Sequence, residues 1–113
     1  MHHPNVPVAV LLVMAAIGLR AMAAPASPSE ALVKLRDEAR PLVAARCGMC
    51  HSKASPKAIP AALAVFDIDR ADWTSRMSKL QLPKILDRFK GPKIPSADIE
   101  KVTAYVEAEL ASR

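Results

Sequence analysis

The chain has 113 residues, enough for one small domain, and only two cysteines, which excludes a disulfide-stabilised scaffold. Aromatic residues make up 4% of the chain, so its own side chains could build only a small core. The formal net charge of +5 favours an acidic partner, and the lack of an Arg/Lys stripe with interleaved aromatic residues argues against nucleic acid.

An apolar run over residues 6–19 comes first and is followed by Ala21 and Ala23, which flank a methionine. This order is typical of a secretory signal peptide with a small-x-small cleavage site, and we expect cleavage after Ala23. The alternative is an uncleaved membrane anchor, but the run is short for a membrane crossing. The sequence therefore predicts a signal peptide over 1–23 and one exported domain over 24–113, without a membrane span after cleavage.

The first helix of the domain is predicted to begin at Ser27. Ser27 would be the N-cap, Pro28 would occupy the first helical position and Glu30 would complete a capping box. Apolar residues then recur at helical spacing. Pro41 removes one backbone donor, so we expect a kink or a split there, with a second short turn over 42–46.

This helix leads into Cys47-Gly48-Met49-Cys50-His51, the pattern of a covalent attachment site for a c-type haem. Cysteines three apart lie on one side of a helical turn, so both sulfurs can form thioether bonds along one edge of a porphyrin. His51 would then lie under the ring as the proximal iron ligand. The alternatives are a thiol redox pair or half of a zinc site. Against them, the chain has no third cysteine and no alternating strand pattern beside the motif.

Residues 52–60 include two prolines and are predicted to be irregular. The carbonyl groups of residues 55–60 are the candidates to accept a hydrogen bond from the second ring nitrogen of His51. Residues 61–68 form a small apolar stretch, either a short helix or a buried extended segment. We expect it to pack in the core through Leu63, Val65 and Phe66.

Asp69 is predicted to cap a helix from Arg70 to about Leu80, with Trp73, Met77 and Leu80 on one face. Pro83 then begins a short helix through Lys90 that Gly91 ends. Ser96 is predicted to cap the last helix, which should pack across the first. Its apolar stripe consists of Ile99, Val102, Val106 and Leu110, with Tyr105 beside it.

Met77 is the only methionine after the haem motif, and a thioether opposite His51 would stabilise ferrous iron. The alternative for Met77 is that it only fills a gap in the core. In that case Lys79 would be the sixth ligand of the iron, or the sixth position would be open. Trp73 and Arg76 are candidates for contacts with the haem propionates. Core packing is the alternative for Trp73, and a solvated position is the alternative for Arg76.

Taken together, these features resemble a small monohaem class I-type cytochrome c of the bacterial periplasm. The resemblance rests on the capped first helix leading into Cys47–His51, on Met77, and on a last helix with Tyr105-Val106 where such domains often have Tyr-Leu. It implies an all-α domain wrapped around one covalent haem, with crossed N- and C-terminal helices. It also implies that Cys47 and Cys50 bind the haem, with His51 as the proximal and Met77 as the distal ligand.

The sequence departs from this family around Met77. The distal methionine of the family usually lies in a loop, often before a proline, whereas Met77 precedes Ser78 on a predicted helix. The spacing from Trp73 to Met77 is closer to the Trp-x-x-x-Met pattern of haem domains attached to periplasmic dehydrogenases.

Three functions follow from these observations. The first is an electron carrier that transforms no substrate, either a soluble carrier or the electron-accepting subunit of a dehydrogenase. Lys79, Lys84, Lys90 and Lys93 could then surround an exposed haem edge and steer an acidic redox partner, or could simply be solvated. The second function is a haem with an open sixth site that binds a small gas molecule or peroxide. The third is a thiol redox or metal protein.

Overall fold

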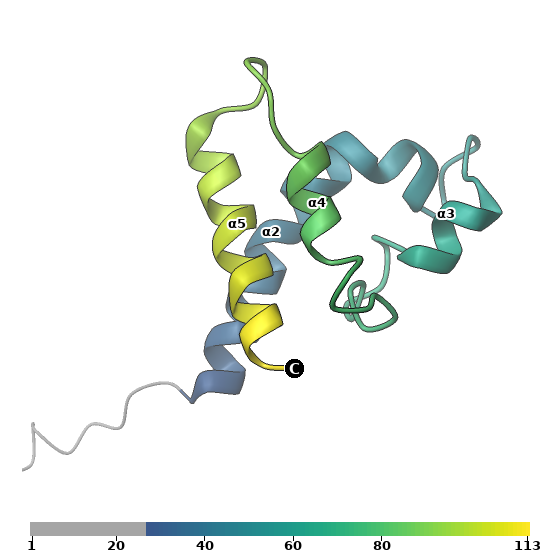
Figure 1. Cartoon of the computed structure of the whole chain (residues 1–113). Helices are drawn as coiled ribbons and strands as arrows, with labels where there is room; N and C mark the ends of the chain where they lie inside the picture. Colours follow the sequence, from purple (N-terminus) through teal and green to yellow (C-terminus); the bar gives the residue numbers. More distant parts are fainter. Residues whose placement is uncertain (1–26) are drawn as a thin grey trace, which may run out of the picture.

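The computed structural model describes residues 27–113, so the predicted signal peptide over 1–23 lies outside it. Four α-helices and no strand occur in this part of the chain (Figure 1). They are α2 (Pro28–His51), α3 (Pro60–Val65), α4 (Pro83–Arg88) and α5 (Ser96–Ala111). The predicted all-α class is therefore confirmed for the residues described.

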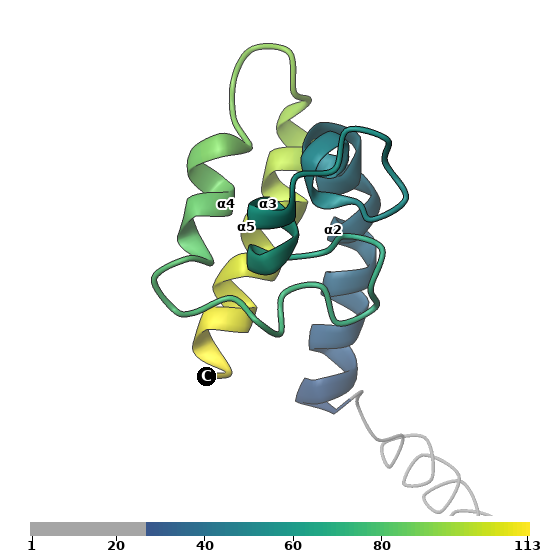
Figure 2. The same ribbon diagram turned by 90° about the vertical axis from the view of Figure 1, so that its right-hand side faces the viewer.

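Helix α2 begins at the predicted position, with Ser27 as its N-cap. The Ser27 hydroxyl accepts a hydrogen bond from the Glu30 amide at 3.2 Å, and Pro28 occupies the first turn. Pro41 lies inside this helix, which continues without interruption to His51, so a split at Pro41 is wrong. Figures 1 and 2 show the last turns of α2 at an angle to the first turns, as expected for a helix with an internal proline.

The core lies where α5 packs against α2. Ala39 and Val43 from α2 have no exposed surface, and neither have Val102, Tyr105 and Val106 from α5. Helix α4 packs against α5, and α3 packs against the end of α2 (Figure 2). Because most of the stability of a helix in a protein comes from packing of its apolar face, this shared apolar interface stabilises both helices.

Helix α5 begins one residue earlier than predicted, because Ser96 is its first residue and not its cap. Pro95 stands at the N-cap position, and its carbonyl accepts hydrogen bonds from the amides of Asp98 and Ile99. Helix α4 ends at Arg88, two residues before the predicted end. The chain then turns at Gly91, whose φ of 124° lies in the region that favours glycine.

The helix predicted over residues 70–80 is wrong, because this segment is a series of turns. Its local backbone bonds span three residues, as from the Met77 amide to the Thr74 carbonyl at 3.1 Å. Asp69 does not cap a helix. Its carboxylate instead accepts hydrogen bonds from the Ser52 hydroxyl at 2.6 Å and the Ala54 amide at 3.2 Å. Trp73 and Met77 are buried, whereas Leu80 is 83% exposed, so the three do not share an apolar face.

Candidate functional site

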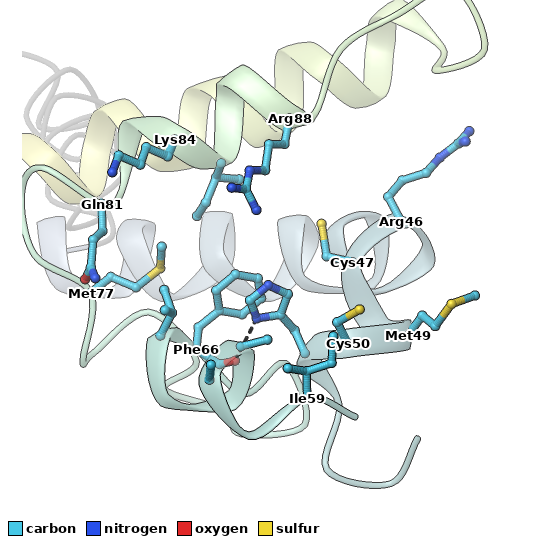
Figure 3. Close-up of a pocket in the computed structure, with 15 residues that line it drawn as sticks. Arg46, Cys47, Met49, Cys50, Ile59, Phe66, Met77, Gln81, Lys84 and Arg88 are labelled. Atoms are coloured by element: carbon cyan, nitrogen blue, oxygen red, sulfur yellow. Dashed lines mark hydrogen bonds between the residues drawn. The ribbon is translucent and has the colours of Figure 1, made fainter. Parts of the chain in front are cut away.

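A pocket of about 710 Å³ lies between the end of α2, helix α3, the segment before α4, and α4 itself (Figure 3). This volume falls in the range of roughly 300–1,000 Å³ that is usual for ligand sites. The haem motif and Met77, which lie far apart in the sequence, both line it. Most of the remaining lining is apolar and comes from α3, Phe66 and Ile85.

Cys47 and Cys50 lie in the last turns of α2, where the sequence predicted one helical turn. Both thiols are free, partly exposed, and line the same pocket. Figure 3 shows the two cysteines close together at one end of the pocket, with Met77 and Gln81 at the other. Two sulfurs in this arrangement can reach adjacent positions on one edge of a flat ligand.

The ring of His51, the last residue of α2, is held by a hydrogen bond at Nδ1. Its Nδ1 lies 3.1 Å from the Phe66 carbonyl oxygen, the bond drawn as a dashed line in Figure 3. Since a carbonyl oxygen can only accept, Nδ1 carries the proton, and Nε2 keeps the lone pair that binds a metal ion. The ring also stacks on that of Phe66, with 3.7 Å between the ring centroids.

The partner of His51 was predicted among residues 55–60, and this is wrong. The chain turns back after the loop, so that the Ile59 amide bonds the Cys50 carbonyl at 3.2 Å and the Ile68 amide bonds the His51 carbonyl at 2.8 Å. These two bonds bring Phe66, in extended conformation, beside the imidazole. No local sequence signal marks Phe66 for this role, because it depends on pairing between distant backbone groups.

Met77 is 4% exposed and lines the pocket from a segment without helical structure. The family's distal methionine usually lies in a loop, so the helical part of the noted departure is wrong, whereas Ser78 still stands where a proline often follows. Lys79, the alternative iron ligand, is exposed and does not line the pocket. Of the two candidates, only Met77 therefore faces the space beside His51.

Trp73 and Arg76 do not line the pocket. Trp73 is 1% exposed and packs against the edge of Phe66 and against Tyr105, with ring centroids 5.7 and 5.6 Å away. Its indole Nε1 is buried without a hydrogen-bond partner in the described part of the chain. Arg76 is exposed. The burial of Trp73 agrees with the alternative that it is a core residue, and the exposure of Arg76 agrees with the alternative that it is solvated. Contacts of either residue with haem propionates stay predictions.

Positive charge gathers at the pocket. Arg46, Lys84 and Arg88 line it, and no carboxylate of residues 27–113 does. In Figure 3 Arg88 points into the pocket and Arg46 points away from it. Of the four clustered lysines only Lys84 lines the pocket. An anionic or electron-rich ligand would suit this lining.

The electrostatics of Cys47 do not favour a redox-active thiol. Burial raises the pKa of the Cys47 thiol, and the positive charge of Arg88 only partly opposes this shift. Reactive thiols have a lowered pKa and are often found at helix N-termini, whereas Cys47 is near the C-terminal end of α2. Both features argue against the thiol redox hypothesis.

Comparison of the chain with protein-family models, with curated proteins and with solved structures gave no match. Within residues 27–113, no three or more His, Cys, Asp or Glu side chains form a cluster that could hold a metal ion. None of the helices described combines the length and the apolar character that a membrane crossing requires.

Proposed function

We propose that this protein is a periplasmic electron carrier with one covalently bound haem c. The observation that carries the proposal is that one pocket is lined by the two thiols of the haem motif, by an imidazole with a free Nε2, and by the only thioether after the motif. This set of donors fits a haem held by thioether bonds and by two axial ligands.

In this proposal Cys47 and Cys50 attach the haem, His51 is the proximal ligand and Met77 is the distal ligand. The haem supplies an iron that cycles between the ferric and ferrous states. The Phe66 carbonyl fixes the tautomer and orientation of His51, as a hydrogen-bond acceptor behind a metal-binding histidine does. The soft sulfur of Met77 would favour the ferrous state and so raise the reduction potential.

The apolar lining from α3, Phe66 and Ile85 would lower the local polarity around a bound haem iron. Helices α2 and α5, which pack on each other, would be the crossed N- and C-terminal helices that the resemblance implies. The haem would also supply the apolar bulk that a chain with 4% aromatic residues lacks.

The pocket favours electron transfer over binding of a gas molecule or peroxide. An open sixth site needs the position opposite His51 to be free, whereas the side chain of Met77 is buried against that pocket. Peroxide chemistry also uses a distal acid–base group, and His51 is the only histidine of the predicted mature domain. Arg46, Lys84 and Arg88 would favour a redox partner with an acidic docking surface.

The test is an optical spectrum of the exported protein in the oxidised and reduced states, followed by a denaturing pyridine step. We expect a c-type haemochrome that stays with the polypeptide, and a weak long-wavelength methionine–iron band in the ferric form. The ferrous form should bind carbon monoxide slowly and weakly. Fast, tight binding without the methionine–iron band would support the open-site function, and two titratable thiols in the denatured chain would contradict covalent haem.

A further inference from the structure

The segment that carries Met77 has little structure of its own. Between Asp69 and Pro83 its local backbone bonds are those of turns, and a turn bond fixes only a few residues. Holding such a segment in one place costs about 1–2 kcal/mol of conformational entropy per residue. Contacts from elsewhere in the fold must therefore keep the Met77 side chain in the pocket.

One such contact comes from Arg113, which follows the end of α5. Its guanidinium donates through Nη2 to the Thr74 carbonyl at 2.7 Å, and through Nη1 to the Met77 carbonyl. The same guanidinium is anchored by Glu109, whose Oε1 lies 3.2 Å from Nε and 3.1 Å from Nη2. The side chains of this ion pair are only 21% and 13% exposed, so solvent screens it little.

A second contact lies beside the first. The hydroxyls of Thr74 and Tyr105 are hydrogen-bonded at 2.5 Å, and both side chains are buried. Tyr105 and Glu109 are one turn apart on α5, so the same face of one helix holds the segment through both contacts. The segment is thereby fixed to α5 by side chains that do not line the pocket.

We propose that Arg113 is a positioning residue for Met77, holding the Met77 backbone against α5 so that the thioether stays in the pocket. The inference rests on the proposed function, because it assigns to Met77 the role of distal ligand. The planar guanidinium suits this role, since its rigidly arranged N–H groups can donate to Glu109 and to two carbonyl groups at the same time. A lysine has the same charge but not this geometry.

The holoprotein and its Arg113→Ala variant test the inference by two measurements. The first is oxidation of Met77 by chloramine-T, followed by mass spectrometry and scaled to Met49, which is 63% exposed and serves as an internal reference. The second is the methionine–iron band together with carbon monoxide binding. A hydrogen bond to a charged group changes an equilibrium by roughly tenfold or more. We expect about a tenfold rise in Met77 oxidation, a weaker band and faster carbon monoxide binding.

Two control variants separate positioning from general loosening. Arg70→Ala removes an exposed ion pair with Asp72 in the same segment and should change neither measurement. Leu110→Ala removes partly buried packing near the end of α5 but keeps the Arg113 side chain that bonds the Thr74 and Met77 carbonyls. If Leu110→Ala, at equal loss of stability, exposes Met77 as much as Arg113→Ala does, Arg113 has no specific role. If Met77 in Arg113→Lys is protected from oxidation as fully as in the wild-type protein, the inference is likewise overturned, because positive charge alone would then be enough to hold the segment.

These measurements distinguish a failure of the Arg113 inference from a failure of the proposed function. A wild-type protein without the methionine–iron band would contradict the distal role of Met77, but Met77 oxidation would still report whether Arg113 holds the segment. A wild-type protein with the band, and an Arg113→Ala variant with unchanged oxidation and unchanged band, would leave the proposed function standing and overturn the role of Arg113.

Discussion

The imidazole of His51 lies flat against the ring of Phe66, with 3.7 Å between the centroids and 1° between the planes, and its Nδ1 bonds the carbonyl of the same residue. One residue thus fixes both the tautomer and the plane of the candidate iron ligand. The side chain supplies the stacking and the backbone supplies the hydrogen bond, so the two effects can be separated by mutation.

Replacing Phe66 by alanine should destabilise the fold while leaving the carbonyl in place. Phe66 is 6% exposed and contacts both His51 and Trp73. Truncation of a buried phenylalanine costs about 3–5 kcal/mol in the free energy of unfolding. Denaturant unfolding of the holoprotein measures this loss. Leu80→Ala is the matched control: Leu80 is 83% exposed, so its loss should change stability by about 0.5 kcal/mol or less.

Replacing Met77 by leucine distinguishes a ligand from a core residue. Leucine has nearly the same volume, so packing alone would change by less than about 1.5 kcal/mol. If the sulfur binds iron, Met77→Leu should abolish the methionine–iron band and lower the reduction potential, since the soft ligand no longer favours ferrous iron. Ferric absorption and a redox titration measure the two effects. An unchanged band and potential would assign Met77 to the core only.

Tyr105 should titrate at unusually high pH. Burial is the main cause that raises the pKa of Tyr105 to about 12, and the hydrogen bond between Thr74 and Tyr105 partly opposes this rise. Because the folded pKa lies above the unfolded value near 10, the resulting stabilisation is complete below pH 10 and is lost as the pH rises toward 12. The chain has a single tyrosine, so near-ultraviolet absorbance follows it directly.

The Thr74→Val variant provides the comparison for this titration. Thr74 lowers the pKa of Tyr105, so valine at position 74 should move the titration to still higher pH. It also leaves the buried tyrosine hydroxyl without its partner, at a cost of about 1–3 kcal/mol in stability. Phenolate absorbance that appears near pH 10 in the wild-type protein would contradict the burial of Tyr105.

Asp69 should make the fold sensitive to acid. Hydrogen bonds from the Ser52 hydroxyl and the Ala54 amide lower the pKa of Asp69 below its usual value of 3.8. The stabilisation is therefore present above about pH 4 and is lost as the pH falls through the folded pKa. Asp69→Asn should show a smaller loss of stability on acidification. Thermal unfolding over pH 3–6, a range on both sides of about pH 4, compares the two proteins.

Much of this protein was predictable from local patterns. The start of α2 follows from the capping chemistry of Ser27, and the positions of α4 and α5 follow from their prolines and apolar spacing. The haem-type motif depends on two cysteines three residues apart in one helical turn, and this spacing of Cys47 and Cys50 can be read directly from the sequence. These features depend on residues within one or two turns of each other.

The tertiary structure alone decided the rest. Residues 70–80 have the apolar spacing of a helix, but the chain instead places Trp73 and Thr74 against α5, and these distant contacts outweigh the weak preference for a helix. The Phe66 carbonyl beside His51 and the Arg113 guanidinium beside Met77 join residues 15 and 36 positions apart. No sequence period encodes such pairs, because each arises only when the helices have packed and have brought separate parts of the backbone together.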